Sequence, residues 1–358
     1  MKKTYFTVGP SQLYPTVPQH IQDALDRDIF SVSHTGAFFV DTYKSLNDNL
    51  RQLFNIPPTY HVFFTGSSTE SMHSIIASTV HAKSVHLITG GFSNKFHKVA
   101  VDLHKQPVTI DLPWDKETDL SKLDIPADAE LLCITENDTS IGLQLPLGPF
   151  RTIKKDNPSL LIAVDVVSSV PYVDIDYSYV DMAFFSVHKG LGLPAGLGIL
   201  IANDASIEKA KSLLLKGVSI GGHHSLVSLA EKEASFKTPE TPNVFSVFLL
   251  EKVTGDLLAE GLETTRKETI AKAQLIYDYF DRHPRYKPLI QGSYRSQTTP
   301  VISVNGKADD IAAALADRGF LVSKGYRPYE KDHIRIANFP ALTEEDVRSL
   351  LEAMDAVL

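Results

Sequence analysis

The sequence has only one cysteine, Cys133, so no disulfide can form within the chain. Charged or polar residues interrupt every apolar run before it reaches the length of a membrane span. Lys2 and Lys3 stand near the start, but no apolar segment follows them as it would in a secretory signal peptide. We therefore expect a cytoplasmic protein that neither crosses a membrane nor depends on disulfides.

The sequence also lacks any block of basic residues. It has 35 Lys and Arg against 43 Asp and Glu, and its formal net charge is −8. Such an acidic balance is atypical of nucleic-acid-binding proteins, so we expect small-molecule partners. We expect no metal site, because His223 and His224 are neighbours that would point in different directions in regular structure. No cysteine or spaced histidine pair accompanies them.

Short apolar runs alternate with amphipathic helical stretches over the first two thirds of the chain. Runs this short, apolar and β-branched are typical of strands covered on both faces. Strands separated by helices imply right-handed crossovers and a mostly parallel sheet. The sequence therefore predicts an α/β fold. The expected strands are 61–64, 85–89, 131–135, 161–164, 182–185 and 198–202.

A helical stretch without proline, residues 244–283, separates this region from a second α+β pattern. Thr343 and the acidic residues after it are suited to open a final helix, because they complement the helix N-terminus. The later expected elements are strands at 300–304, 320–323 and 333–337 and a helix at 309–317. We predict an N-terminal arm (1–15), a large domain (16–250) and a small domain (251–358).

The most informative residues are Asp165, at the end of one apolar strand, and Lys189, just after the next. In a parallel sheet both would lie at the ligand-binding edge, on either side of a flat ring. A lysine amine can form an imine with a carbonyl cofactor, and a carboxylate can keep a pyridinium nitrogen protonated. Taken singly, such an aspartate is commonly a turn residue and such a lysine a solvated loop residue.

Three further segments have weaker signals. Gly66-Ser67-Ser68-Thr69, between a strand and a helix, suits a phosphate group but is also a common helix cap. Phe92 follows the next strand and is suited either to cover a ring face or to fill the core. Asn137 to Gly142 offers hydroxyl and amide donors, or is an ordinary polar turn.

In order and spacing, these segments resemble the class V aminotransferases, which are pyridoxal-phosphate enzymes of fold-type I. The resemblance implies a mostly parallel seven-stranded large domain with helices on both faces and a smaller α+β C-terminal domain. It also implies a pyridoxal 5′-phosphate cofactor and a homodimer with shared active sites. The motifs that carry it are Gly66 to Thr69, Asn137 to Ser140, Asp165, His188-Lys189 and Pro194-Ala195-Gly196-Leu197-Gly198.

The resemblance also implies roles for single residues. Lys189 would hold the cofactor as a Schiff base, Asp165 would pair with the ring nitrogen, and both would be catalytic. Arg335 would bind the substrate α-carboxylate, although an arginine between Ile334 and Ile336 also fits an exposed strand face. The implied cofactor-binding residues are Gly66, Ser67, Ser68, Phe92, Thr139, Asp165, Ser168, His188 and Lys189, with Thr241 and Asn243 from the partner chain; Thr238 is a rival to Thr241.

Within class V the start of the chain is similar to the phosphoserine aminotransferases of serine biosynthesis. Members of that group bind the substrate phosphate with an arginine after the residue matching His34 and another in the loop matching 66–70. This chain has Thr35 after His34 and no arginine in that loop, although His34 remains a predicted substrate-binding residue. Lys95, Arg327 and Lys324 are the candidate replacements.

Two other activities remain open. An alanine- or serine-glyoxylate aminotransferase is the alternative, because Pro194 to Gly198 fits that branch. A lyase similar to the cysteine desulfurases is more distant, because such an enzyme needs a thiol on a mobile loop. Cys133 instead lies in a predicted buried strand. A protein that only binds or regulates is disfavoured, because Lys189 and Asp165 are both present.

Overall fold

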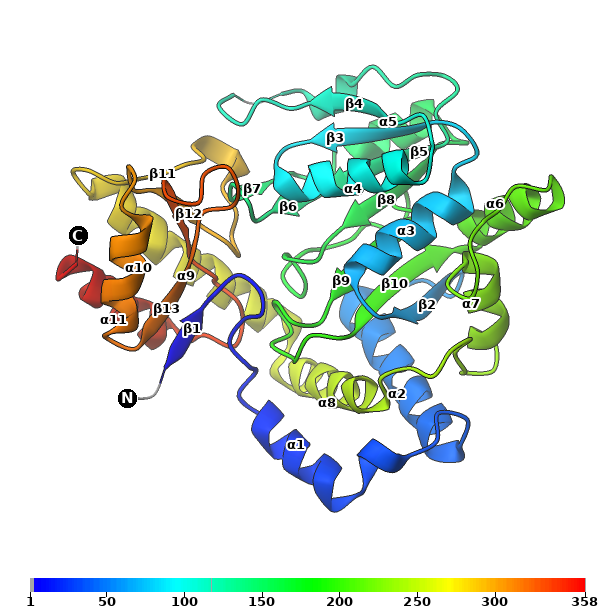
Figure 1. Cartoon of the computed structure of the whole chain (residues 1–358), viewed down its shortest axis with the longest axis horizontal. Coiled ribbons are helices and arrows are strands. Elements are labelled where there is room, and N and C mark those ends of the chain that lie inside the picture. Colours follow the sequence, from blue (N-terminus) through cyan, green and yellow to red (C-terminus); the bar gives the residue numbers. More distant parts are fainter. Residues whose placement is uncertain (1–2, 117, 358) are drawn as a thin grey trace.

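The computed structural model describes residues 3–116 and 118–357. Its centre is a seven-stranded sheet in the order β2-β10-β9-β8-β5-β3-β4 (Figure 1). All neighbouring pairs are parallel except those of β10, so the predicted mostly parallel sheet is confirmed. The strands are β2 (Tyr60–Thr65), β3 (Ser84–Ile88), β4 (Val108–Asp111), β5 (Leu131–Thr135), β8 (Leu161–Asp165), β9 (Met182–Ser186) and β10 (Gly198–Asn203).

Strand β10 is the antiparallel exception in this mostly parallel sheet. It pairs with β9 on one side and with β2 on the other. The connection over residues 187–197 contains no helix. A parallel partner needs a long crossover, whereas a short connection returns the chain antiparallel. The Lys189 loop is that short connection.

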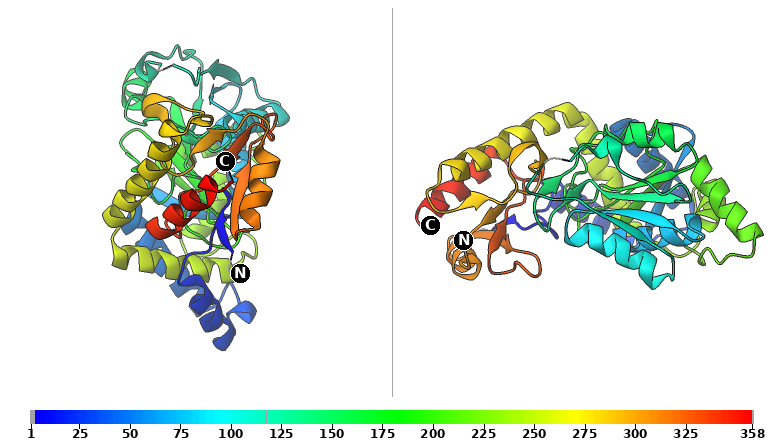
Figure 2. Two further views of the ribbon diagram at one scale, coloured as in Figure 1. Left: turned by 90° about the vertical axis from the view of Figure 1, so that its left-hand side faces the viewer. Right: turned by 90° about the horizontal axis from the view of Figure 1, so that it is seen from above.

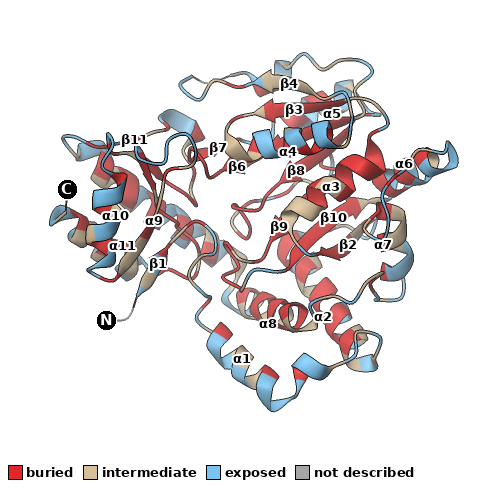
Figure 3. Cartoon of the chain, in the orientation of Figure 1, coloured by how far each residue is buried: buried red, intermediate tan, exposed pale blue. Residues whose placement is uncertain are grey.

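Helices cover the strands, which are largely buried (Figure 3). Helices α3 and α4 lie in front of the sheet in Figure 1, and α2 packs along α8 beside it. The apolar side chains of these elements form one continuous core. The helices are α1 (Val17–Asp26), α2 (Ala37–Phe54), α3 (Ser68–Thr79), α4 (Gly91–Asp102), α5 (Phe150–Asp156), α6 (Asp204–Leu215), α7 (Leu226–Glu233) and α8 (Val244–Glu260).

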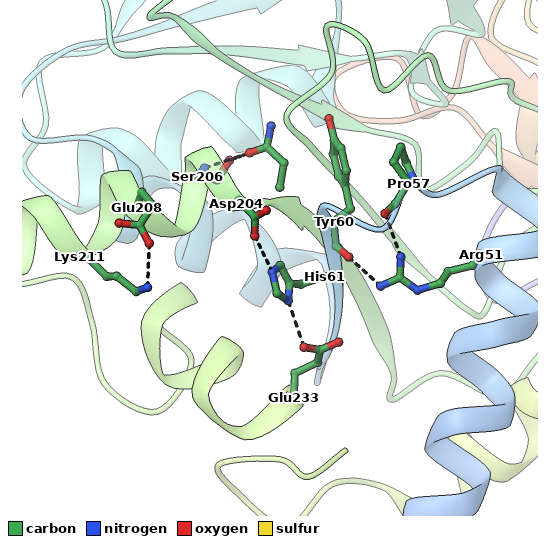
Figure 4. A network of polar contacts seen from close by, with 10 residues as sticks. Arg51, Pro57, Tyr60, His61, Asp204, Ser206, Glu208, Lys211 and Glu233 are labelled. Atoms are coloured by element: carbon green, nitrogen blue, oxygen red, sulfur yellow. Dashed lines mark hydrogen bonds and ion pairs between the residues drawn. The ribbon is translucent and has the colours of Figure 1, made fainter. Parts of the chain in front are cut away.

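A polar network fixes the edge strand β2 to the surrounding helices (Figure 4). The imidazole of His61 lies between Glu233 of α7 and Asp204 of α6, with both N···O distances at 3.0 Å. Hydrogen bonding to Glu233 is the main reason that the pKa of His61 is raised. Arg51 of α2 donates to the carbonyl oxygens of Pro57 and Tyr60 at 2.9 and 2.7 Å. The network therefore joins three helices to the start of the sheet.

The predicted helical stretch after residue 244 consists of two helices, α8 and α9 (Leu262–Arg282), which meet at Gly261 with φ +90°. Helix α9 leads into a second body with its own core, beside the large sheet (Figure 2). Thr343 caps the last helix as expected. The remaining elements are β1 (Thr4–Phe6), β11 (Lys287–Pro288), β12 (Val301–Ser303), β13 (Phe320–Lys324), β14 (His333–Arg335), α10 (Ala308–Ala316) and α11 (Glu344–Asp355).

The second body contains a five-stranded sheet in the order β1-β13-β14-β12-β11. Strand β1, from the start of the chain, pairs in parallel with β13. The predicted domain limits at residues 15 and 250 stay predictions. No helix in the described part of the chain combines the length and the apolar character that crossing a membrane requires.

Candidate active site

A cavity of about 170 Å³ lies beyond the carboxyl ends of β8 and β9. This is the edge at which parallel sheets bind ligands. Seven of the predicted cofactor-binding residues meet there from separate parts of the chain, together with others that the sequence analysis did not assign. The lining residues are Ser67, Ser68, Thr69, Met72, Phe92, Lys95, Asn137, Asp165, Val167, Ser168, Ser186, His188 and Lys189.

Lys189 lies in the loop after β9 with its side chain in the cavity. The loop is held by Ser11, whose N–H donates to the His188 carbonyl at 3.1 Å and whose hydroxyl donates to the Lys189 carbonyl at 2.6 Å. Gly190 is required for close packing, because a Cβ there would collide with the carbonyl oxygen of Val170. Burial lowers the pKa of the Lys189 amine to about 8, against an opposing effect of Asp165. The lysine is therefore positioned to lose its proton near neutral pH.

Asp165 is the last residue of β8 and is only 4% exposed. Its Oδ1 accepts a hydrogen bond from the Val167 N–H at 3.0 Å. Burial raises the pKa of this carboxyl to about 6, and the nearby Lys189 limits the rise. No hydrogen bond or ion pair joins Asp165 to Lys189 among the residues that the structure describes. The two groups thus influence each other electrostatically while a cavity remains for a ligand.

The N-terminus of α3 forms another part of the cavity. Ser67 caps this helix by accepting from the Glu70 N–H at 3.3 Å, and the Ser68 N–H donates to the Ser186 hydroxyl at 2.9 Å. Lys95 of α4 reaches the same turn and donates to the Thr69 hydroxyl at 2.6 Å. A helix N-terminus with hydroxyls and an ammonium group is suited to a phosphate.

Phe92 lines the cavity from the first turn of α4, and its ring centroid lies 5.0 Å from the Lys189 Nζ. Asp138 fixes this turn, since its Oδ2 accepts from the N–H groups of Phe92 and Ser93 at 3.1 Å each. Tyr326 of the second body lies next to Phe92, with the ring centroids 5.1 Å apart. Asp138 therefore fixes the backbone at Phe92, and Tyr326 packs against its ring.

The hairpin of β6 (Asn137–Asp138) and β7 (Leu143–Gln144) supplies further polar atoms. The Asn137 amide donates to the hydroxyls of Ser168 and Thr298 at 2.8 and 2.9 Å. Within the described chain, Oδ1 of Asn137 and Oγ1 of the buried Thr139 have no hydrogen-bond partner. Buried polar atoms normally have partners, so these two are candidates for contact with a ligand.

Arg335 of β14 extends from the second body toward the large domain. Its Nε donates to the Lys324 carbonyl at 2.7 Å, and its guanidinium carbon lies 5.7 Å from the Tyr326 ring centroid. A longer contact of 3.4 Å reaches the Thr139 carbonyl. Burial lowers the pKa of the guanidinium to about 10. Arg335 thus lies between the two bodies, and the exposed-face interpretation does not fit this position.

Several predicted residues lie in the described chain but outside the cavity lining. Thr241 and Asn243 are exposed, and Asn243 caps α8 by accepting from the Ser246 N–H at 3.0 Å. Thr238 is buried, and its hydroxyl donates to the Glu240 carbonyl at 2.7 Å. The predicted residues in this group are Gly66, Thr139, Arg335, His34, Thr238, Thr241 and Asn243.

The sequence analysis missed some residues that line the cavity. Ser186 ends β9 as Asp165 ends β8, so its position at a strand end was a usable signal. Met72 lies four residues after Ser68 on α3, which places both on one face of that helix. Val167 had no comparable signal, because it lies in an irregular turn after β8.

Comparisons with known proteins agree with this architecture. The model of the family "Aminotransferase class-V" matches residues 5–350. A crystal structure of a phosphoserine aminotransferase from Cytophaga hutchinsonii is 41% identical, with a TM-score of 0.96 over 99% of this chain and 98% of that one. A phosphoserine aminotransferase of Rhodococcus opacus is 25% identical over 99% of this chain and 94% of its own length. An alanine-glyoxylate aminotransferase from Nostoc sp. is 20% identical, covers 100% of this chain and 95% of that one, and shares the fold with a TM-score of 0.80.

Proposed function

The chain belongs to the class V aminotransferases, and from this premise we propose that it transfers the amino group of phosphoserine to 2-oxoglutarate. It is a transaminase that depends on pyridoxal 5′-phosphate. One observation carries the proposal: Lys189 and Asp165 are buried at neighbouring strand ends and line one cavity with the N-terminus of α3. This arrangement provides an amine, a carboxyl group and a turn suited to a phosphate in one place.

The residues present fit the cofactor. The turn at Ser67 and Ser68 would hold its phosphate, Phe92 would cover one ring face, and Asp165 would pair with the ring nitrogen. The unpartnered oxygens of Asn137 and Thr139 are further candidates for hydrogen bonds to it. We also keep Gly66, Ser168 and His188 as proposed cofactor-binding residues. When bound, pyridoxal phosphate supplies a ring that accepts the electron pair left on the substrate α-carbon.

Lys189 and Asp165 have distinct proposed tasks. Lys189 would bind the cofactor covalently and, once released, take the proton from the substrate α-carbon as a positioned general base. A pKa of about 8 suits this task, because a useful fraction of the amine is neutral at physiological pH. Asp165 would keep a proton on the ring nitrogen. Its burial strengthens the attraction between the carboxylate and a cationic ring.

We propose that Arg335 and Lys95 recognise the two ends of the substrate. Arg335 has its Nη2 left for an α-carboxylate, since its Nε donates to the Lys324 carbonyl at 2.7 Å and its Nη1 makes the longer contact of 3.4 Å to the Thr139 carbonyl. Lys95 of α4 lines the cavity and contacts Thr69. Thr69 belongs to the 66–70 loop, in which the arginine of phosphoserine aminotransferases is missing. We therefore assign the substrate phosphate to Lys95. His34 remains a proposed substrate-binding residue.

We propose a cytoplasmic homodimer whose active sites are shared. Thr241 and Asn243 are exposed and lie outside the cavity lining of their own chain, so a second copy can use them. Thr238 is buried and already hydrogen-bonded within its own turn, which favours Thr241 over its rival. Cross-linking or light scattering of the purified protein tests the dimer.

Visible absorbance during titration with single amino acids tests the reaction. We expect phosphoserine and glutamate to bleach the yellow band of the lysine-bound cofactor, and K189A to lack that band. If only alanine or serine bleaches it, the chain is an aminotransferase of the glyoxylate type. The missing arginines at Thr35 and in the 66–70 loop favour that alternative. A protein that takes up no cofactor would contradict the whole proposal.

K95M tests the recognition of phosphate. Loss of a charge-assisted hydrogen bond costs about 1.5–3 kcal/mol, so KM for phosphoserine should rise at least about tenfold. The matched control is K98M, which removes an exposed lysine one turn further along α4. An equal effect of K95M on phosphoserine and on glutamate would assign Lys95 to the cofactor instead.

The distant alternative, a lyase that uses a cysteine thiol, has no support in the position of Cys133. This residue lies on the central strand β5 and is only 2% exposed. Burial raises the pKa of its thiol well above the usual value. A buried, protonated thiol on a fixed strand is not suited to attack a substrate.

A further inference from the structure

Three side chains outside the active-site lining converge beside the first turn of α3. They are Glu70 of α3 and the neighbours His223 and His224, from the connection between α6 and α7. One ligand atom from each residue lies within 4.8 Å of the other two. We propose that Glu70, His223 and His224 bind one divalent transition-metal ion of the zinc class per chain.

The two histidines converge because their segment is irregular. Residues 217–225 contain no helix or strand, whereas consecutive residues of a helix or strand would point in different directions. The two imidazole rings lie 4.8 Å apart between centroids, with their planes at 84°. The argument against a metal site from adjacency alone therefore does not hold for this segment.

The chemistry of the three groups suits zinc better than calcium or magnesium. Two imidazole nitrogens and one carboxylate oxygen form a known ligand set for zinc, with a further position left for water. Zinc ligands lie about 2.1 Å from the ion, so tetrahedral neighbours are about 3.4 Å apart. His223 is exposed and His224 is half-buried, so small side-chain rotations can close the remaining distance.

Within the described chain, the polar contacts between these three residues do not explain why they converge. Among the described residues, no hydrogen bond or ion pair joins Glu70 to either histidine. Oε2 of Glu70 accepts from the Gly66 N–H at 2.8 Å, which leaves Oε1 for an ion. The ion would connect the 217–225 segment to the turn that contains Ser67. Metal binding would thus stabilise the phosphate-binding turn from outside the cavity.

Calorimetric titration of the holoenzyme with zinc chloride tests the proposal. The protein carries no histidine tag, is treated with a chelator beforehand, and is kept in phosphate-free buffer. We expect one zinc per chain and a rise in Tm on binding. E70Q keeps an acceptor for the Gly66 N–H but loses the charged ligand, and H223A removes an exposed imidazole. Each should weaken binding at least about tenfold, equivalent to 1.4 kcal/mol.

H104N is the matched control. It removes another exposed imidazole, and asparagine tolerates the left-handed backbone of His104 at φ 55°. Zinc affinity should be unchanged in this variant. Three results would overturn the proposal. They are no saturable binding to the wild type, wild-type zinc affinity in both E70Q and H223A, or one zinc per two chains. None of these measurements depends on the substrate.

Discussion

The reaction of the cofactor-free protein with pyridoxal phosphate should report the proton affinity of Lys189 directly. Only a neutral amine attacks the cofactor aldehyde, so the rate should rise with pH as Lys189 loses its proton. Burial lowers the pKa of this amine to about 8 from its usual 10.5. At pH 7.5 about a quarter of the amine would be neutral, against about one part in a thousand without the shift. We therefore expect the shift to raise the rate at pH 7.5 about two-hundredfold.

Two variants should move the inflection of the curve of rate against pH in opposite directions. Asp165 raises the pKa of Lys189 and Arg335 lowers it, each less than burial does. D165N should therefore shift the inflection below pH 8, and R335Q should shift it above pH 8. Asparagine keeps an oxygen for the Val167 N–H, so the backbone of the turn after β8 need not change.

Stopped-flow absorbance at the band of the lysine-bound cofactor follows the reaction at each pH. The same series with N-acetyl-lysine amide corrects for ionisation of pyridoxal phosphate itself. A wild-type inflection near pH 10 would refute the link between burial and reactivity. A shift of both variants in the same direction would refute the assignment of opposite charge effects.

Three other perturbations follow from the geometry. D138A removes a buried acceptor that fixes the first turn of α4, so urea unfolding should show a loss of about 3 kcal/mol or more. Burial raises the pKa of the Glu136 carboxyl from 4.5 to about 7. The folded state therefore holds the carboxyl proton more tightly than the unfolded state, and it loses stability as the pH rises from 4.5 to about 7. E136Q should therefore gain up to about 3 kcal/mol over the wild type at pH 8 and little at pH 5, measured by urea unfolding at both. Y326F should keep the wild-type KM for substrate, whereas Y326A should raise it, because the ring supports Phe92 and Arg335. Equal KM values in the two variants would show that the Tyr326 ring does not position substrate.

The central strands could be predicted because each combines local signals. Six runs matched strands of the large sheet, since each is apolar, short and bounded by turn residues. Strand β4 was missed because it is a short edge strand in which Thr109 and Asp111 are exposed. Strand β1 was missed for another reason. Three residues carry no local pattern, and their pairing with β13 joins positions more than 300 residues apart.

The candidate site was predictable where a residue type at a strand end implies chemistry. Asp165, Lys189 and the Ser67 turn are of this kind, and all line one cavity. Asp138 was seen only as part of a polar turn. Its contacts with the start of α4 depend on how β3 and β5 are placed side by side, which no short segment encodes.

The segment of residues 4–14 connects the two bodies a second time. Phe6 accepts a hydrogen bond from the Ala337 N–H at 2.9 Å, and the Val8 N–H donates to the Ser323 hydroxyl at 3.1 Å, both in the second body. A few residues later, the N–H groups of Ser11 and Tyr14 donate to the loop that contains Lys189. Together with α9, this segment is a second stretch of chain that runs between the large domain and the second body. A displacement of the second body would therefore be transmitted along this segment to the loop that contains Lys189.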